Sequence, residues 1–162
     1  MNSTRDLVGA ARDIVRRRFD DREELAIEIL NHQCGTDSVH ARAAEQVFDA
    51  LESATGIPAG RLRPQDNFGS LFRVFRSELG SEWESRWATL GLGTYIEPFA
   101  YELLEVLDVG SNQGFWRKAW ASLDPPPANE EQMIDEIMRL SLCEFVRFAI
   151  SMRRPQDRRG AD

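Results

Sequence analysis

Apolar residues recur every three or four positions along most of this chain, which is the spacing that places them on one face of an α-helix. Residues 4–18 show this pattern first. Glycine commonly ends a helix, and glycines follow several periodic stretches here, at Gly35, Gly56, Gly80 and Gly110. We find no convincing strand pattern. The sequence therefore predicts an all-α multi-helix bundle of roughly seven to nine helices.

Helix starts are marked by side chains that can accept hydrogen bonds from the free N–H groups of a first turn. Asp20 or Asp21 is expected to begin the second helix, and Thr36 the third. A cap residue followed three positions later by Glu or Gln marks further starts, at Ser81, Thr94, Asn129 and Ser141. We expect helices over 36–55, 68–79, 81–90, 94–109, 111–123 and 129–150, the last with a restart at Ser141.

The length of the chain suits one domain. We divide a single helical domain, 1–152, into an N-terminal helical pair (1–40), a central body (41–123), a Pro-rich spacer (124–128) and a C-terminal helix or helices (129–152). Residues 153–162 lack large apolar side chains, which predicts a mobile tail. Whether 129–152 pack on their own chain or on a second subunit stays open.

Composition narrows the classes of partner. The 162 residues carry a formal net charge of −7, and nucleic-acid binding requires a concentrated positive surface, so we expect no nucleic-acid partner. No apolar run approaches the length of a membrane span, and charged residues occupy the N-terminal region where a secretory signal would be apolar. These features predict a cytoplasmic protein in which Cys34 and Cys143 are free thiols.

One stretch has a more individual character. After the helical pattern that begins near Ala43, the segment GIPAGRLRPQDNF (56–68) contains two prolines that fix the backbone between two helices. This segment resembles the first loop of acyl carrier proteins, and LSLCEFVRFAI (140–150) is similar to their last helix. The resemblance implies a carrier-like helical core, with residues 1–40 and 81–123 wrapped around it.

Carrier proteins attach phosphopantetheine to the serine of an Asp-Ser-Leu motif, where a helix N-terminus stabilises the phosphate. That motif is absent from this sequence. Ser70, between Gly69 and Leu71, and Ser77, which follows Arg76, lie nearest to its expected position. The resemblance thus implies either a carrier-derived protein without an attachment site or a working carrier modified on Ser77 or Ser70.

A separate hypothesis concerns His32, Cys34 and His40, which lie close together in the sequence. Imidazole and thiolate are common metal ligands, and a histidine near a cysteine can activate the thiol as a nucleophile. The spacing matches no standard zinc motif. A metal site or a thiol enzyme centred on Cys34 is therefore an alternative function.

The sequence favours a non-catalytic interaction module that needs no cofactor. It contains no Gly-rich phosphate loop, no nucleophile elbow and no metalloprotease motif. We expect the module to bind a protein partner or a small apolar ligand between its helices. The residues expected to line that site are Leu62, Phe68, Phe72, Phe75, Trp83 and Trp87, for which core packing is the competing interpretation.

Overall fold

The computed structural model describes residues 3–36, 39–91, 93–107 and 128–161. Over these residues it is the all-α multi-helix bundle that the sequence predicts, with one small two-stranded ribbon. The α-helices are α1 (Ser3–Arg17), α2 (Ile27–Gln33), α3 (Ala41–Thr55), α4 (Phe68–Leu71), α5 (Ser81–Thr89), α6 (Ala100–Leu107), α8 (Glu130–Met138) and α9 (Leu142–Ala161). The 3-10 helices are η1 (Ala59–Arg61) and η2 (Arg76–Glu78), and the strands are β1 (Val74–Phe75) and β2 (Tyr95–Ile96). The helix expected over 111–123 and most of the Pro-rich spacer lie outside the described residues.

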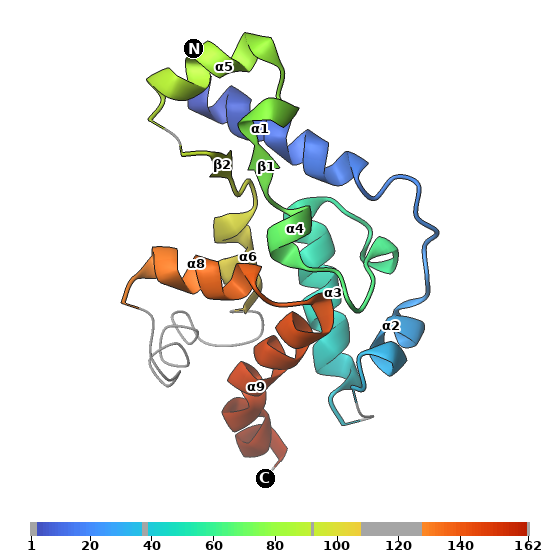
Figure 1. Cartoon of the computed structure of the whole chain (residues 1–162). Coiled ribbons are helices and arrows are strands. Elements are labelled where there is room, and N and C mark those ends of the chain that lie inside the picture. The colour runs from blue at the N-terminus through green and yellow to red at the C-terminus, as the bar shows by residue number, and fades with distance from the viewer. Residues whose placement is uncertain (1–2, 37–38, 92, 108–127, 162) are drawn as a thin grey trace.

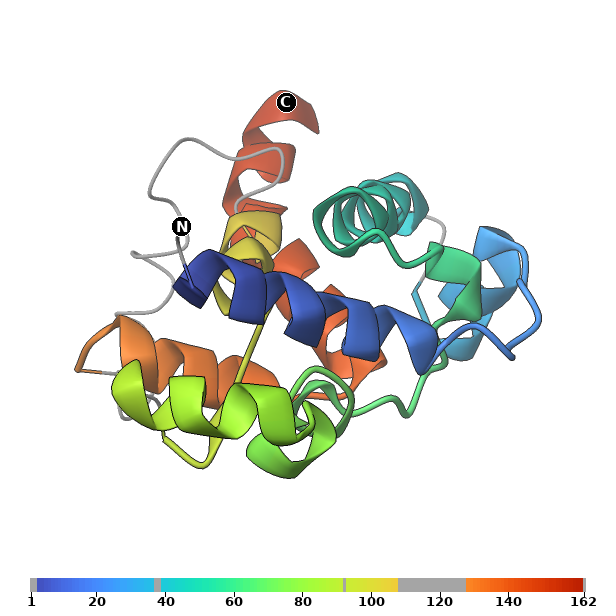
Figure 2. The same cartoon turned by 90° about the horizontal axis from the view of Figure 1, so that it is seen from above.

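Helix α3 is the centre of the bundle. It packs against α6 and α9 and receives α2 along its side. Helix α1 crosses one end of the molecule beside α5, while α9 points away toward the other end (Figures 1 and 2). The apolar stripe predicted for α1 is buried and consists of Leu7, Ala11 and Val15, with Phe19 just after the helix. The helical period of the sequence therefore marks the inner face of α1 correctly.

Arginine side chains on or just after α1 fasten it to the rest of the bundle. The Nε of Arg12 donates to the carbonyl oxygen of Pro98 at 2.9 Å, and the Nε of Arg16 donates to that of Thr55 at 2.8 Å. These carbonyls end or connect other elements and lack a helical partner of their own. The positive charges on this helix therefore serve tertiary packing.

The single helix expected over 68–79 is wrong. Helix α4 ends at Leu71, because Arg18 donates its Nη1 to the carbonyl oxygens of Leu71 and Arg73, the second at 3.0 Å. Those carbonyls then need no N–H from a further helical turn. Nη2 of Arg18 pairs with Glu78 at 2.7 Å, so one side chain shapes the segment from α4 to η2.

The absence of a strand is also a wrong prediction. Strand β1 pairs antiparallel with β2, with Val74 opposite Ile96 and Phe75 opposite Tyr95. The helix start expected at Thr94 therefore does not form, and α6 begins at Ala100 instead. Two-residue strands are too short to show an alternating pattern in the sequence.

The second helix starts later than expected. It begins at Ile27 and not at Asp20 or Asp21, because the N–H of Leu25 donates to the carbonyl oxygen of Gly60 at 2.8 Å and holds the preceding chain extended. The two backbones lie so close that a Cβ on Gly60 would be 2.3 Å from the carbonyl oxygen of Leu25. Gly60 is thus the residue that permits this contact.

The two C-terminal helix starts are confirmed. The Asn129 side chain accepts a hydrogen bond from the N–H of Gln132 at 3.0 Å. Ser141 and Glu144 form a reciprocal capping box, in which each side chain accepts from the other residue's N–H, at 3.3 and 3.2 Å. These bonds from Ser141 hold the pKa of Glu144 below its ordinary value. Ser81, by contrast, is the first residue of α5 and makes no cap hydrogen bond.

Helix α9 continues to Ala161 and so includes most of the segment expected to be a tail. Arg and Gln are good helix formers, which allows a helix to extend beyond its apolar face. The residues over 153–161 are helical in this structure, although the sequence shows no apolar period for them.

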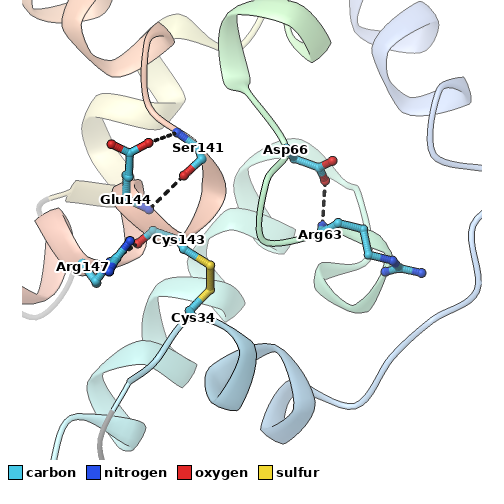
Figure 3. The surroundings of a disulfide bond; sticks show 7 residues. All are labelled: Cys34, Arg63, Asp66, Ser141, Cys143, Glu144 and Arg147. Carbon is cyan, nitrogen blue, oxygen red and sulfur yellow. Dashed lines mark hydrogen bonds between the residues drawn. A yellow bond between two sulfur atoms is a disulfide. The ribbon is translucent and has the colours of Figure 1, made fainter.

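Cys34 and Cys143 form a disulfide, so the prediction of two free thiols is wrong (Figure 3). Cys34 directly follows α2, and Cys143 is the second residue of α9. Both are buried where these helices meet, and their Cα atoms lie 5.0 Å apart, within the range that a disulfide spans. Because the two cysteines are 109 positions apart in the sequence, no local pattern reveals the pairing. Free thiols were one argument for a reducing compartment, and the disulfide removes that argument.

Candidate functional site

Four of the six residues expected to line a binding site are core residues. Leu62, Phe68, Phe72 and Trp87 are almost completely buried. The rings of Phe68 and Phe72 stack with their centroids 5.0 Å apart, and further rings contact them edge-on or tilted, from Phe19, Phe99 and Phe145. These aromatic residues form the hydrophobic centre where α4, α6 and α9 meet. The four residues therefore pack in the core and do not form the binding surface that the sequence predicts.

The other two expected residues reach the surface. Trp83 is partly buried against the core, and the guanidinium carbon of Arg86 lies 4.9 Å from the centroid of its ring. Phe75 is 48% exposed although it lies in a strand, which makes it one of the large apolar side chains that the bundle leaves in water. Phe75 also lines a hollow in the described part of the structure.

That hollow, which we call the ribbon groove, lies between α4, the β1–β2 ribbon and α8, which Figure 1 labels. Its volume is about 800 Å³. Its lining combines apolar, polar and charged side chains: Asn67, Gly69, Ser70, Arg73, Phe75, Tyr95, Asp135, Met138 and Arg139. These residues come from three segments that the fold brings together.

The floor of the ribbon groove is held by close backbone contact. The amide of Asn67 accepts from the N–H of Ser70 at 3.0 Å and donates to the carbonyl oxygen of Arg139 at 3.2 Å. A Cβ on Gly69 would lie 2.6 Å from the carbonyl oxygen of Met138, so α4 and α8 approach at the distance that only glycine permits. The two sides of the groove are thus fixed relative to each other.

One wall carries a preorganised cluster of charge and aromatic rings. Arg73 pairs with Glu97 at 3.1 Å, and its guanidinium carbon lies 4.1 Å from the centroid of the Tyr95 ring. The ring of Phe75 meets that of Tyr95 edge-on at 6.1 Å. Burial raises the pKa of Glu97, the hydrogen bond and charge of Arg73 oppose that rise, and the nearby charge of Asp135 adds to it.

A second hollow, which we call the acid pocket, adjoins the first and has a volume of about 510 Å³. Tyr95 and Asp135 line both hollows, whereas Arg73 lines only the ribbon groove. The lining of the acid pocket is Gly93, Thr94, Tyr95, Glu97, Tyr101, Glu131, Ile134 and Asp135. Sequence reasoning missed this pocket because its residues lie in and beside β2, in α6 and in α8, and no spacing along the chain connects them.

The two candidate attachment serines lie in different places. Ser70 is exposed in α4 and lines the ribbon groove. Ser77 is exposed in η2, outside the lining of that groove. Neither follows the loop at the start of a long helix, because α4 has four residues and η2 has three.

The hypothesis centred on Cys34 fails in this oxidised state. Its sulfur is bonded to that of Cys143, so it is neither a thiolate ligand nor a free nucleophile. His32 is exposed in the last turn of α2, and His40 occupies the N-cap position of α3. In the part of the chain that the structure describes, no three His, Cys, Asp or Glu side chains cluster as a metal site would require.

Comparison with models of protein families, with curated proteins and with solved structures finds no match for this chain. Among the described helices, none is both long and apolar enough to cross a membrane.

Proposed function

We propose that this protein is a non-catalytic interaction module that binds a segment of a partner protein in the ribbon groove. The observation that carries the proposal is the exposed side chain of Phe75 at the edge of this groove, with Tyr95 beside it and Met138 on the opposite wall. Exposed aromatic rings in a concave surface are the usual anchors of protein interfaces. The fixed floor lowers the entropic cost of binding, because the two walls are already in place.

The lining favours a protein segment over a small apolar ligand. Small-molecule sites are mostly apolar and enclose their ligand. Here Asn67, Ser70, Arg73 and Arg139 stand among the apolar side chains, and the groove is open to solvent. Such a mixed lining can pair with the backbone and side chains of a peptide, while Phe75 and Tyr95 contact its apolar residues.

A random peptide library displayed on phage tests this proposal when it is selected on the immobilised protein. Enriched peptides are then synthesised, and their affinity is measured by fluorescence anisotropy. We expect Phe75→Ala to weaken binding about tenfold or more, as removal of an interface anchor does. Ile29→Ala is the matched control, because Ile29 is 46% exposed but lies on α2, away from the groove. No enrichment, or equal affinity for the Phe75 variant, overturns the proposal.

The acyl-carrier resemblance supports a second candidate, a carrier with phosphopantetheine on Ser70. Ser70 is exposed within the ribbon groove, whose lining also holds Arg73 and Arg139, and arginine is well suited to a phosphate. The test is the intact mass of protein isolated from its own host, with peptide mapping. Added phosphopantetheine on Ser70, or on Ser77, supports the carrier function, whereas an unmodified chain contradicts it.

A further inference from the structure

We infer that the acid pocket receives a basic side chain, arginine or lysine, of the peptide segment that binds in the adjoining ribbon groove. This inference rests on the proposed function and names the chemistry of the partner. The two hollows share Tyr95 and Asp135, so a segment anchored on Phe75 can place a neighbouring side chain in the acid pocket.

Charge complementarity is the first argument. Glu97, Glu131 and Asp135 line the acid pocket, and none of the residues described in its lining is basic. Glu97 is paired with Arg73, but Glu131 and Asp135 have no ion pair with any residue that the structure describes. A cation entering the pocket therefore meets two carboxylates that the fold itself does not neutralise.

The aromatic walls are the second argument. Tyr95 and Tyr101 line the pocket, and Tyr101 is 65% exposed. The face of a tyrosine ring attracts an ammonium or guanidinium group. The structure already uses this attraction once, because the guanidinium of Arg73 lies over the Tyr95 ring. Arg73 itself does not line the acid pocket, where the rings of Tyr95 and Tyr101 are the aromatic surface that a second cation would contact.

The spacing of the carboxylates favours an organic cation over a metal ion. Glu97, Glu131 and Asp135 form no metal-binding cluster in the described part of the chain. They surround about 510 Å³, which accommodates a long basic side chain together with part of a peptide backbone. Asp135 is nonetheless close enough to raise the pKa of Glu97, and a bound cation would relieve that repulsion.

Arginine amide tests the acid pocket directly, without a peptide. Its addition should shift the aromatic NMR signals of Tyr95 and Tyr101, whereas citrulline amide, a neutral analogue of the same shape, should not. The double variant Glu131→Gln/Asp135→Asn should weaken arginine amide about tenfold. The charge-matched control is Glu45→Gln/Glu84→Gln, which removes two exposed carboxylates from α3 and α5 and should leave the affinity unchanged. Equal shifts with both amides, or equal loss in both double variants, overturn the inference.

The peptides selected on phage separate this inference from the proposed function. If both hold, enriched peptides carry Arg or Lys next to an apolar residue, and replacing that base by citrulline or norleucine weakens binding about tenfold. Peptides that require Phe75 but contain no basic residue would support the proposed peptide binding in the ribbon groove. They would overturn the inference that the acid pocket receives a basic side chain. If no peptide is enriched, the proposed function fails, and the amide titration alone decides whether the pocket binds a cation.

Binding of a second copy of this chain through its own arginines would appear as concentration-dependent association in sedimentation.

Discussion

The carboxylate of Asp66 accepts a hydrogen bond at 2.6 Å from Nη1 of Arg22, which lies 44 residues earlier in the chain. The same carboxylate oxygen accepts the N–H of Arg63 at 2.7 Å. Asp66 is 8% exposed, and its own carbonyl oxygen accepts the N–H of Leu142 at 2.8 Å. This residue therefore joins the loop before α4 both to the end of the N-terminal helix region and to the start of α9.

Replacing Asp66 with Ala should lower the free energy of unfolding by about 2 kcal/mol, because it removes the carboxylate that pairs with Arg22 and leaves the N–H of Arg63 without its acceptor. Urea denaturation measures the change. Asp20→Ala is the control, since Asp20 is 63% exposed and lies 3.8 Å from Arg61, so its removal should cost less than about 0.5 kcal/mol. Equal stability of the two variants would contradict the importance of the buried carboxylate.

Loss of the disulfide should destabilise the fold by about 2–5 kcal/mol, because the bond closes a long loop in the unfolded chain. Cys34→Ala, Cys143→Ala and the double variant should have similar stability. Dithiothreitol should lower the stability of the wild-type protein and leave that of the double variant unchanged. Alkylation before reduction checks the premise: two labelled thiols in unreduced native protein would show that the bond is absent in solution.

Two glycines should respond to alanine in opposite directions. Gly60→Ala should cost about 1–3 kcal/mol, because the added Cβ collides with the backbone of Leu25. Gly9→Ala should stabilise by up to about 1 kcal/mol, since Gly9 lies inside α1 with open space around its would-be Cβ. Thermal and urea unfolding measure whether each substitution lowers or raises the free energy of unfolding. A neutral Gly60→Ala would mean that the two backbones separate easily.

The raised pKa of Glu97 gives a pH dependence of defined sign. Its ordinary value is 4.5, and burial raises it in the folded protein. The folded state then holds the proton more tightly than the unfolded state, so this residue's contribution is full below pH 4.5 and is lost as pH rises through the folded pKa. As the pH rises from 4.5 through the folded pKa, the free energy of unfolding should fall less in Glu97→Gln than in the wild-type protein. Parallel stability profiles of the two proteins would contradict the shift.

Much of the bundle was predictable because its buried stripes are local. Positions such as Leu7, Ala11 and Val15 repeat at helical spacing, and the Ser141 capping box lies within four residues. The errors at α4 and at the start of α2 share one cause: contacts between distant segments override the local pattern. Arg18 ends α4, and Gly60 keeps the chain near Leu25 extended.

The candidate site was less predictable than the fold. The sequence predicts Phe68, Phe72 and Phe75 as site residues because all three are aromatic. It does not show which of the three the fold leaves exposed. Glu131 and Asp135 looked like ordinary charges on a solvated helix face, which is the usual meaning of such residues. They line one pocket only when α8 is placed beside β2, and that placement depends on tertiary packing.

The dependence of residues 68–78 on Arg18 sets an order of events in folding. These residues contain α4, β1 and η2, and their backbone and Glu78 take hydrogen bonds from a side chain more than fifty positions upstream. Contacts of such large sequence separation form late, after the loop between them has closed. During synthesis Arg18 leaves the ribosome before its acceptors do, so the segment can acquire its structure as soon as α1 has docked.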